Sequence, residues 1–241
     1  MVLSDSDPRK WTLKEHTRVK HELLNKYLTP WIYKLGSANR ELLYIDGFAG
    51  RGEYNEAGKS NDIGSPIIAM RKAQEHRAKI PKFWCLFVEK DKENFDNLCM
   101  VIEREKASCP HPKINCVNGD FEAEVTKLLN EKQGRLPPTF CFIDPFGFNA
   151  PFSVVKRIMA IPRAEVFFTF MSRDINRFTS SEIHTDALNK LFGTSAWEEI
   201  KDNPKIGHIR EKYLLNLYKS QLDKEAKVKY IIPFMVKMPE K

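Results

Sequence analysis

Short apolar runs alternate with amphipathic stretches along most of this sequence. Each run is short enough for one strand, and residues with helical spacing follow it, which is the pattern of a parallel sheet covered by helices on both faces. Ser65, with Pro66 beside it, is expected to cap the helix after the first run. The runs expected to be strands are Leu42–Phe48, Phe83–Glu89, Ile114–Val117, Phe140–Ile143 and Val166–Met171. The sequence therefore predicts an α/β fold of the Rossmann-like type with a mostly parallel sheet.

Residues 1–38 are expected to form a helical segment that precedes the sheet. Thr12 and Glu15 have the spacing of a capping box, and apolar residues follow with helical spacing. We expect Pro30 to kink or break this helix and Gly36 to end it. The apolar stripe of the helix is interpreted as a surface that packs against the core.

The remaining chain is divided by function rather than by linkers. Residues 39–171 are expected to be the cofactor-binding sheet core, and residues 172–241 a helical region with a last strand. Ser195 and Glu198 form a second capping box before a long helix, and Val228–Val236 is expected to be the sixth strand. No repeat or flexible linker divides the sequence, so we expect a single domain.

Charge and cysteine content narrow the class of protein. The sequence has 39 Lys and Arg against 32 Asp and Glu, a net charge of +7, which is compatible with a polyanionic partner but does not establish one. The 5 cysteines include no Cys-x-x-Cys pair and the histidines show no metal-binding spacing, so we expect neither a disulfide framework nor a metal site. No apolar run approaches the roughly 18 to 20 residues of a membrane span. We expect a reducing, cytoplasmic protein that neither enters a membrane nor binds a metal.

The end of the first strand carries a candidate ligand site. In an open α/β sheet, ligands bind beyond the carboxyl ends of the strands. The first run ends at Asp46 and a glycine-rich turn that contains Phe48, Gly50 and Gly52. Glycines let a ligand approach the backbone, and the Asp46 carboxylate can accept a hydrogen bond from a ligand ammonium group. A tight strand-to-helix turn needs the same glycines without any ligand, so this motif alone leaves both interpretations open.

Acidic residues also follow the next three strands. Glu89 is placed to bind the two hydroxyls of a ribose, and Asp120 to accept from an adenine amino group while Phe121 covers the ring. Asp144 follows four apolar residues and begins the sequence Asp-Pro-Phe-Gly. Each acid has a structural alternative: a solvated strand end for Glu89, a helix cap for Asp120 and a turn cap for Asp144. Together they follow the order that a nucleoside-bearing cofactor requires.

Short motifs over nearly the whole chain resemble the class I S-adenosylmethionine-dependent methyltransferases, and more narrowly the three-Cys-motif partner protein (TcmP) family. The motifs are Trp11–Lys14, Tyr27–Trp31, Tyr44–Gly52, Gly64–Pro66, Phe87–Asp91, Gly119–Phe121, Phe142–Gly147 and Ile175–Arg177. The resemblance implies S-adenosylmethionine as the cofactor and a companion protein with a three-cysteine motif. The residues it implies for the cofactor are Asp46, Phe48, Gly50, Gly52, Glu89, Asp120 and Phe121.

Asp144, Pro145 and Phe146 are similar to the catalytic Asp-Pro-Pro-Tyr motif of amino-methyltransferases. The stretch Asp144–Gly147, together with Pro151 and Phe152, is also similar to the tRNA guanine N2-dimethyltransferases. By that resemblance, Asp144 and the Pro145 carbonyl orient an exocyclic amine, and an aromatic ring, Phe146 or Phe148, stacks on the base. The sequence departs from the methyltransferase pattern in three ways. Phe-Gly replaces Pro-Tyr, about a dozen residues separate Gly52 from the next helix, and one strand follows the long helix where two are usual.

Four cations near the predicted strand ends are expected to contact nucleic acid, with plain surface solvation as the alternative. They are Arg51, Lys90, Arg173 and Arg177. The function expected is methyl transfer to an exocyclic amine of a purine in nucleic acid. A companion subunit that binds a cofactor or partner without turnover is the main alternative, and DNA, RNA and protein all stay open as substrates. Hydride chemistry on a dinucleotide is disfavoured because Asn55 stands where the third glycine is required.

Overall fold

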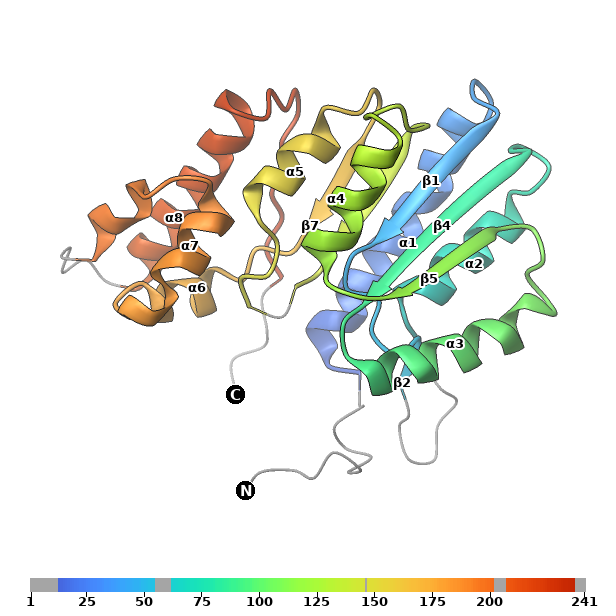
Figure 1. Ribbon diagram of the computed structural model, residues 1–241, viewed down its shortest axis with the longest axis horizontal. Coiled ribbons are helices and arrows are strands. Elements are labelled where there is room, and N and C mark those ends of the chain that lie inside the picture. Colours follow the sequence, from blue (N-terminus) through green and yellow to red (C-terminus); the bar gives the residue numbers. More distant parts are fainter. Residues whose placement is uncertain (1–12, 55–61, 146, 202–206, 237–241) are drawn as a thin grey trace. The chain divides into compact units, whose positions relative to one another are not determined.

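The computed structural model describes residues 13–54, 62–145, 147–201 and 207–236 (Figure 1). The chain divides into two compact units, one made of Met1–Gly119 with Pro233–Lys241 and the other of Asp120–Ile232. Four positions used in the sequence-based predictions, Trp11, Thr12, Asn55 and Phe146, lie outside the described residues.

The first unit is built on three parallel strands in the order β5-β4-β1. Two helices connect them, so the segment is a β-α-β-α-β unit, which is the mononucleotide-binding half of a Rossmann fold. Strand β1 is buried because its residues are apolar on both faces, as expected for a parallel strand covered by helices. The elements are β1 (Glu41–Asp46), α2 (Ser65–Glu75), β4 (Lys82–Glu89), α3 (Lys92–Lys106) and β5 (Lys113–Asn118).

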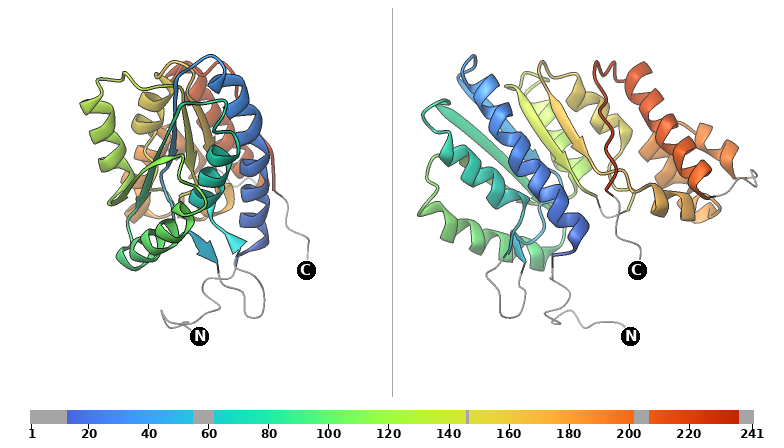
Figure 2. Two further views of the ribbon diagram at one scale, coloured as in Figure 1. Left: turned by 90° about the vertical axis from the view of Figure 1, so that its right-hand side faces the viewer. Right: turned by 180° about the vertical axis from the view of Figure 1, so that it is seen from behind.

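Helix α1 (Glu15–Gly36) precedes the sheet, as predicted, and lies beside α2 (Figure 2). It ends at Gly36, also as predicted, but it begins after Lys14 without a side-chain cap. Of the two effects predicted for Pro30, a break is wrong because the helix continues through this residue, and a kink stays a prediction. Pro30 lies on the exposed side of the helix, so the backbone carbonyl that loses its hydrogen-bond donor faces water. The buried Trp31 and Ile32 hold the residues after it against the core.

The insertion between the glycine turn and α2 begins and ends with a two-stranded antiparallel pair, β2 (Glu53–Tyr54) and β3 (Asp62–Ile63). The amide of Gly64 donates to the carbonyl oxygen of Gly52 at 2.8 Å and closes the insertion at its base. A Cβ atom on Gly64 would lie 3.0 Å from that oxygen, so the close approach requires glycine. Gly64, rather than Ser65 as predicted, is the N-cap of α2.

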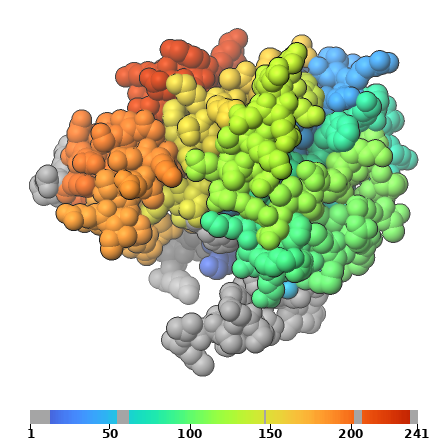
Figure 3. Space-filling view, viewed as in Figure 1, coloured from blue at the N-terminus to red at the C-terminus, as the bar shows by residue number. Residues whose placement is uncertain are grey.

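The second unit contains the parallel pair β6 and β7 and a set of helices. Asp120 caps α4 as the sequence allowed, and Pro151 immediately precedes α5. Residues 172–193, in the region expected to be helical, form two helices and a short 3-10 segment, whose surface is seen as orange atoms in Figure 3. The elements are α4 (Phe121–Glu131), β6 (Thr139–Ile143), α5 (Phe152–Met159), β7 (Glu165–Phe168), α6 (Ser172–Phe178), η2 (Glu182–His184), α7 (Thr185–Phe192), η3 (Ala196–Ile200) and α8 (Gly207–Lys224).

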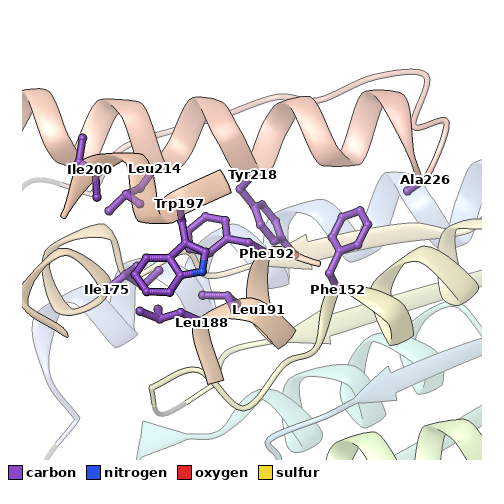
Figure 4. Packing of buried hydrophobic residues seen from close by; sticks show 10 residues of the cluster. All are labelled: Phe152, Ile175, Leu188, Leu191, Phe192, Trp197, Ile200, Leu214, Tyr218 and Ala226. Atoms are coloured by element: carbon purple, nitrogen blue, oxygen red, sulfur yellow. The ribbon is translucent and has the colours of Figure 1, made fainter. Parts of the chain in front are cut away.

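The C-terminal helices of the second unit share a buried core with α5 (Figure 4). Trp197 lies fully buried at its centre and donates to the Asn189 side chain at 2.8 Å. The predicted capping box at Ser195 and Glu198 is absent from η3, where Thr194 Oγ1 accepts from the Ala196 amide instead. The core residues are Phe152, Ile175, Leu188, Leu191, Phe192, Trp197, Ile200, Leu214, Tyr218 and Ala226.

The prediction of a sixth strand at Val228–Val236 was wrong, since none of its residues is part of a strand among the described residues. Pro233 lacks the amide that a sheet ladder needs in the middle of this segment. Several large apolar side chains of the segment Val228–Val236 are exposed, with Ile232 at 84% and Met235 at 76%. The segment therefore has the composition of a strand without the pairing.

The predicted fold class is confirmed. The described strands of the two units include five parallel ones joined by helices, an α/β arrangement of the Rossmann-like type with an N-terminal helix. None of the helices in the described part of the chain is long and apolar enough to cross a membrane.

Candidate functional site

The turn after β1 is organised by Asp46. This side chain is fully buried, and its oxygens accept from the Phe48 amide and from the Tyr44 hydroxyl, each at 3.3 Å. A buried carboxylate is stable only where hydrogen bonds compensate it. The contacts of Asp46 therefore hold the turn in shape from beneath, and its predicted role as a direct ligand contact stays a prediction.

The two glycines predicted to bind the cofactor occupy different surroundings. Both adopt the left-handed conformation, with φ of 63° at Gly50 and 84° at Gly52. A Cβ on Gly52 would lie 3.0 Å from Leu98, so this glycine lets the turn pack against α3. A Cβ on Gly50 would meet no atom of the described residues within 4 Å. Gly50 thus presents open backbone, which is the feature a ligand needs.

Glu89 connects this turn to the end of β4. Its Oε2 accepts from the Gly50 amide and its Oε1 from the Asp91 amide, both at 2.8 Å. Burial raises the pKa of the Glu89 carboxyl above its ordinary value of 4.5, and the bonds from the Asp91 and Gly50 amides oppose that shift. The Lys90 amide also bonds to Glu89. An ionised carboxylate offers about four acceptor positions, so about one remains for a ribose hydroxyl. The structure brings Asp46, Phe48, Gly50, Gly52 and Glu89 together in the first unit.

The two cations predicted for nucleic acid in the first unit differ in exposure. The Arg51 side chain is only 15% exposed; it donates to Asn97 at 3.3 Å and lies 3.8 Å from Glu93. Asn97 also donates to the Arg51 carbonyl at 2.7 Å. Arg51 therefore holds the glycine turn against α3, and its side chain has little exposed surface with which to contact a phosphate. Lys90 is exposed beside Glu89.

Asp120 and Phe121 lie at the start of α4 in the second unit. Asp120 Oδ1 accepts from the Glu122 amide at 3.0 Å, which is the helix-cap alternative that the sequence left open. The side chain of Asp120 also lines a cavity, described below. Phe121 is 2% exposed, so its ring packs in the core and does not present a face to an adenine.

Asp144 and Pro145 directly follow β6, as predicted. Asp144 is half-buried and Pro145 is buried. Phe146 lies outside the described residues, so its stacking role stays a prediction. The half-buried Asp144 is accessible enough to accept a hydrogen bond from a bound group.

The two arginines predicted for nucleic acid in the second unit are exposed on α6. Arg173 and Arg177 are one helical turn apart and therefore project from the same side. Arg177 lies 3.4 Å from Asp174, and its guanidinium stands 4.7 Å from the centre of the Phe178 ring. In the middle of the same helix, Asn176 accepts from Arg210 at 2.9 Å and so joins α6 to α8.

Sequence reasoning missed an aromatic cluster made of Phe148, Phe178 and His184. The ring centres of Phe148 lie 5.4 Å from Phe178 and 5.8 Å from His184, and Phe178 and His184 are 4.5 Å apart. A cavity of about 330 Å³ is lined by Phe148 and by residues of α7. The three rings come from three segments with no shared motif, so only the earlier choice of Phe148 as a stacking candidate pointed toward them.

In the described part of the chain, no group of three or more His, Cys, Asp and Glu side chains is arranged to hold a metal ion. The chain matches no protein-family model, and no curated protein or solved structure matches it.

Proposed function

We propose that the chain is an S-adenosylmethionine-dependent methyltransferase that acts on an exocyclic amine of a purine in nucleic acid. The observation that carries this proposal is the bond from the Gly50 amide to Glu89, because it joins the glycine turn and the strand-end acid into one preformed surface. A nucleoside-bearing cofactor needs an open backbone for close approach and a carboxylate for its ribose, and this surface offers both. The motif resemblance supports S-adenosylmethionine as that cofactor.

The residues present suit the cofactor on two counts. The open side of Gly50 leaves room for a ligand, and Glu89 retains about one acceptor position after bonding the amides of Gly50, Lys90 and Asp91. When bound, S-adenosylmethionine supplies a methyl group on a sulfonium, a leaving group that is already activated. The protein then has to position the acceptor amine, and it needs no metal for this.

Asp144 is proposed to position the target amine. Its carboxylate and the Pro145 carbonyl would each accept one amine hydrogen, which directs the nitrogen lone pair toward the methyl group. Phe146 would cover the base. Asp120 would contribute an acceptor for the adenine of the cofactor. A transfer assay tests these roles directly.

The first experiment measures cofactor binding by calorimetry, with a nicotinamide dinucleotide as the competing ligand class. Glu89→Gln keeps the size of the side chain and one acceptor oxygen, and it should weaken S-adenosylmethionine binding by about 1 to 3 kcal/mol. Glu103→Gln is the matched control because Glu103 is 70% exposed on α3, away from the turn. Equal affinity of wild type and Glu89→Gln, or tighter binding of the dinucleotide, would remove the cofactor assignment.

The second experiment follows transfer of a labelled methyl group to DNA, RNA or protein. Asp144→Asn should fold and bind the cofactor while transfer falls by a factor of about 10² or more. A variant that loses stability but keeps its turnover per folded molecule would make Asp144 a turn cap. If wild type binds the cofactor and transfers no label, even with a three-cysteine-motif companion present, a companion subunit without turnover replaces the enzyme.

A further inference from the structure

The aromatic cluster in the second unit is stacked by a cation on one side. Phe178 and His184 meet at 74° and Phe148 and Phe178 at 83°, so these rings pack edge to face and do not stack face to face. Arg177 lies over the Phe178 ring and its side chain is 68% exposed. Unstacked nucleobases bind to aromatic faces and to guanidinium planes of this kind.

A cavity adjoins this cluster. It has a volume of about 330 Å³, within the range of about 300 to 1,000 Å³ found for small-ligand sites. Phe148 forms one wall, and Ile183, which is 90% exposed and precedes His184, forms another. The cavity is therefore open to solvent, and it meets the aromatic cluster at Phe148.

The cavity is lined mainly by acidic side chains, whereas the exposed side of helix α6 carries two arginines. Three carboxylates, those of Asp120, Glu122 and Asp186, line the cavity together with the cation of Lys190. Asp120 is already assigned to the cofactor adenine, so the carboxylates of Glu122 and Asp186 are the ones left to accept hydrogen bonds from a second base, and all three carboxylates repel phosphate. On α6, Arg173 and Arg177 project from one exposed side and attract phosphate. A ligand with an amine-bearing ring and a phosphate would thus be held ring-inward and phosphate-outward.

We infer that the aromatic cluster and its cavity hold an unpaired nucleobase that carries an exocyclic amine, while Arg173 and Arg177 contact the phosphates of the same strand. The inference rests on the proposed function, which it deepens by naming where the substrate base binds. The partner is a single-stranded or locally opened nucleic acid, because a paired base cannot reach a side-chain cavity without leaving its stack.

The test is binding of short labelled single-stranded oligonucleotides, measured by fluorescence anisotropy. Phe178→Leu removes a ring and keeps apolar volume, and it should weaken binding by roughly 5- to 150-fold, the range for one lost base–aromatic stack. The control is Tyr33→Leu, since Tyr33 is also exposed and has Lys79 over its ring at 5.0 Å, but lies on α1. That variant should stay within about twofold of wild type.

Two further measurements keep the inference testable if Phe178→Leu does not fold. The double variant Arg173→Ala/Arg177→Ala changes only exposed side chains, and it should flatten the dependence of log affinity on log salt by about one to two units. Photocross-linking of a thiouridine-containing oligonucleotide should label peptides that contain Phe148, Phe178 or His184. Cross-links confined to other peptides would overturn the inference.

The identity of the base provides a further comparison in the binding experiment. Oligonucleotides of adenosine or cytidine, which carry exocyclic amines, should bind more tightly than oligouridine, and the preference should be lost in Phe178→Leu. Equal effects of Phe178→Leu and Tyr33→Leu, or no oligonucleotide binding at low salt, would overturn the inference and favour a protein partner at this surface. If the oligonucleotide results hold while the calorimetry of Glu89→Gln fails, the base site stands and the proposed methyltransferase function falls.

Discussion

The carboxylate of Glu89 and the backbone amide of Gly50 lie 2.8 Å apart, 39 positions apart in the sequence. The bond ties the end of β4 to the turn after β1 without any ligand. Because the amides of Gly119 and Ala49 also bond to the carbonyls of Glu89 and Val88, at 3.0 Å each, this edge of the first unit is fixed on several sides. A fixed edge loses little freedom when a ligand binds, which favours affinity.

Alanine substitutions at Gly50 and Gly52 should separate binding from packing. Gly50→Ala places a methyl group in open space, so it should lower the free energy of unfolding by only the left-handed backbone cost of about 1 to 2 kcal/mol. Gly52→Ala adds a contact with Leu98 at 3.0 Å and should cost more. Urea unfolding measures both variants.

Calorimetry on the same pair of variants checks the open side of the turn. Gly50→Ala should weaken S-adenosylmethionine binding although the variant stays folded, because the methyl group occupies the space proposed for the ligand. Cofactor affinity equal to wild type would show that the ligand does not approach Gly50.

Cofactor affinity should depend on pH through Glu89. Burial raises the pKa of this carboxyl above 4.5, so protonation begins at a higher pH than for an exposed glutamate. A protonated carboxyl has lost acceptor capacity for ribose hydroxyls, so affinity should fall as pH decreases through a midpoint above 4.5. Calorimetry across this range measures the midpoint. The midpoint should be absent from Glu89→Gln, and a midpoint that persists in that variant would assign the titration to another group.

In the second unit, Gly193 should be the most sensitive glycine to substitution. It ends α7 with φ of 67°, and a Cβ there would lie 2.6 Å from the Phe152 ring, part of the buried core. Gly193→Ala should therefore cost about 2 to 5 kcal/mol, from the backbone and from overpacking together. Thermal unfolding measures the loss.

Gly134 provides the matched control for that substitution. Its φ is 70°, nearly that of Gly193, but a Cβ there would meet no atom within 4 Å. Gly134→Ala should show only the backbone cost of about 1 to 2 kcal/mol. Similar losses for the two alanine variants would contradict the predicted contact with Phe152.

The ion pair between Arg71 and Glu105 should contribute stability with a defined pH dependence. Arg71 donates to both carboxylate oxygens, at 2.6 and 3.1 Å, and the Glu105 side chain is only 10% exposed. The hydrogen bond from Arg71 lowers the pKa of Glu105 below 4.5. This stability is present above the unfolded pKa and is lost as pH falls through the lower folded pKa.

Arg71→Leu should lower the free energy of unfolding at neutral pH by about 1 to 2 kcal/mol, a modest value because Arg71 is 52% exposed. The difference from wild type should shrink as pH falls below 4.5 and should be lost below the lower pKa of Glu105 in the wild type, where this carboxyl is protonated in both proteins. Lys106→Leu removes a partner from the exposed pair with Glu103 and should change stability by less than about 0.5 kcal/mol. A pH-independent loss in Arg71→Leu would show that packing, and not charge, is responsible.

The sequence was sufficient to predict the strands because parallel strands are apolar on both faces, as β1 and β6 are. It failed at Pro30 because helix propensity does not report that Trp31 and Ile32 are buried on the next turn. It failed again at Val228–Val236, where strand-like composition has no pairing partner among the described residues. The polar residues 172–193 form helices whose apolar stripe is only a few residues long, as the buried Leu188, Leu191 and Phe192 show.

The sequence likewise predicted some features of the candidate site and not others. The strand-end rule was enough to select Glu89 and Gly50, since parallel strands deliver their last residues to one edge. It could not show that Asp46 points beneath the turn or that Arg51 bonds to Asn97, because both depend on side-chain direction. The aromatic cluster depends on contacts between three distant segments, which no single pattern reports.

The hydrogen bond from the Gly64 amide to the Gly52 carbonyl holds the two ends of the insertion together, whatever the number of residues between them. The two glycines are already held together, so sequence added or removed between Tyr54 and Asp62 need not shift the glycine turn or the start of α2. We therefore expect the surface formed by Gly50 and Glu89 to keep its shape when a peptide is grafted between β2 and β3.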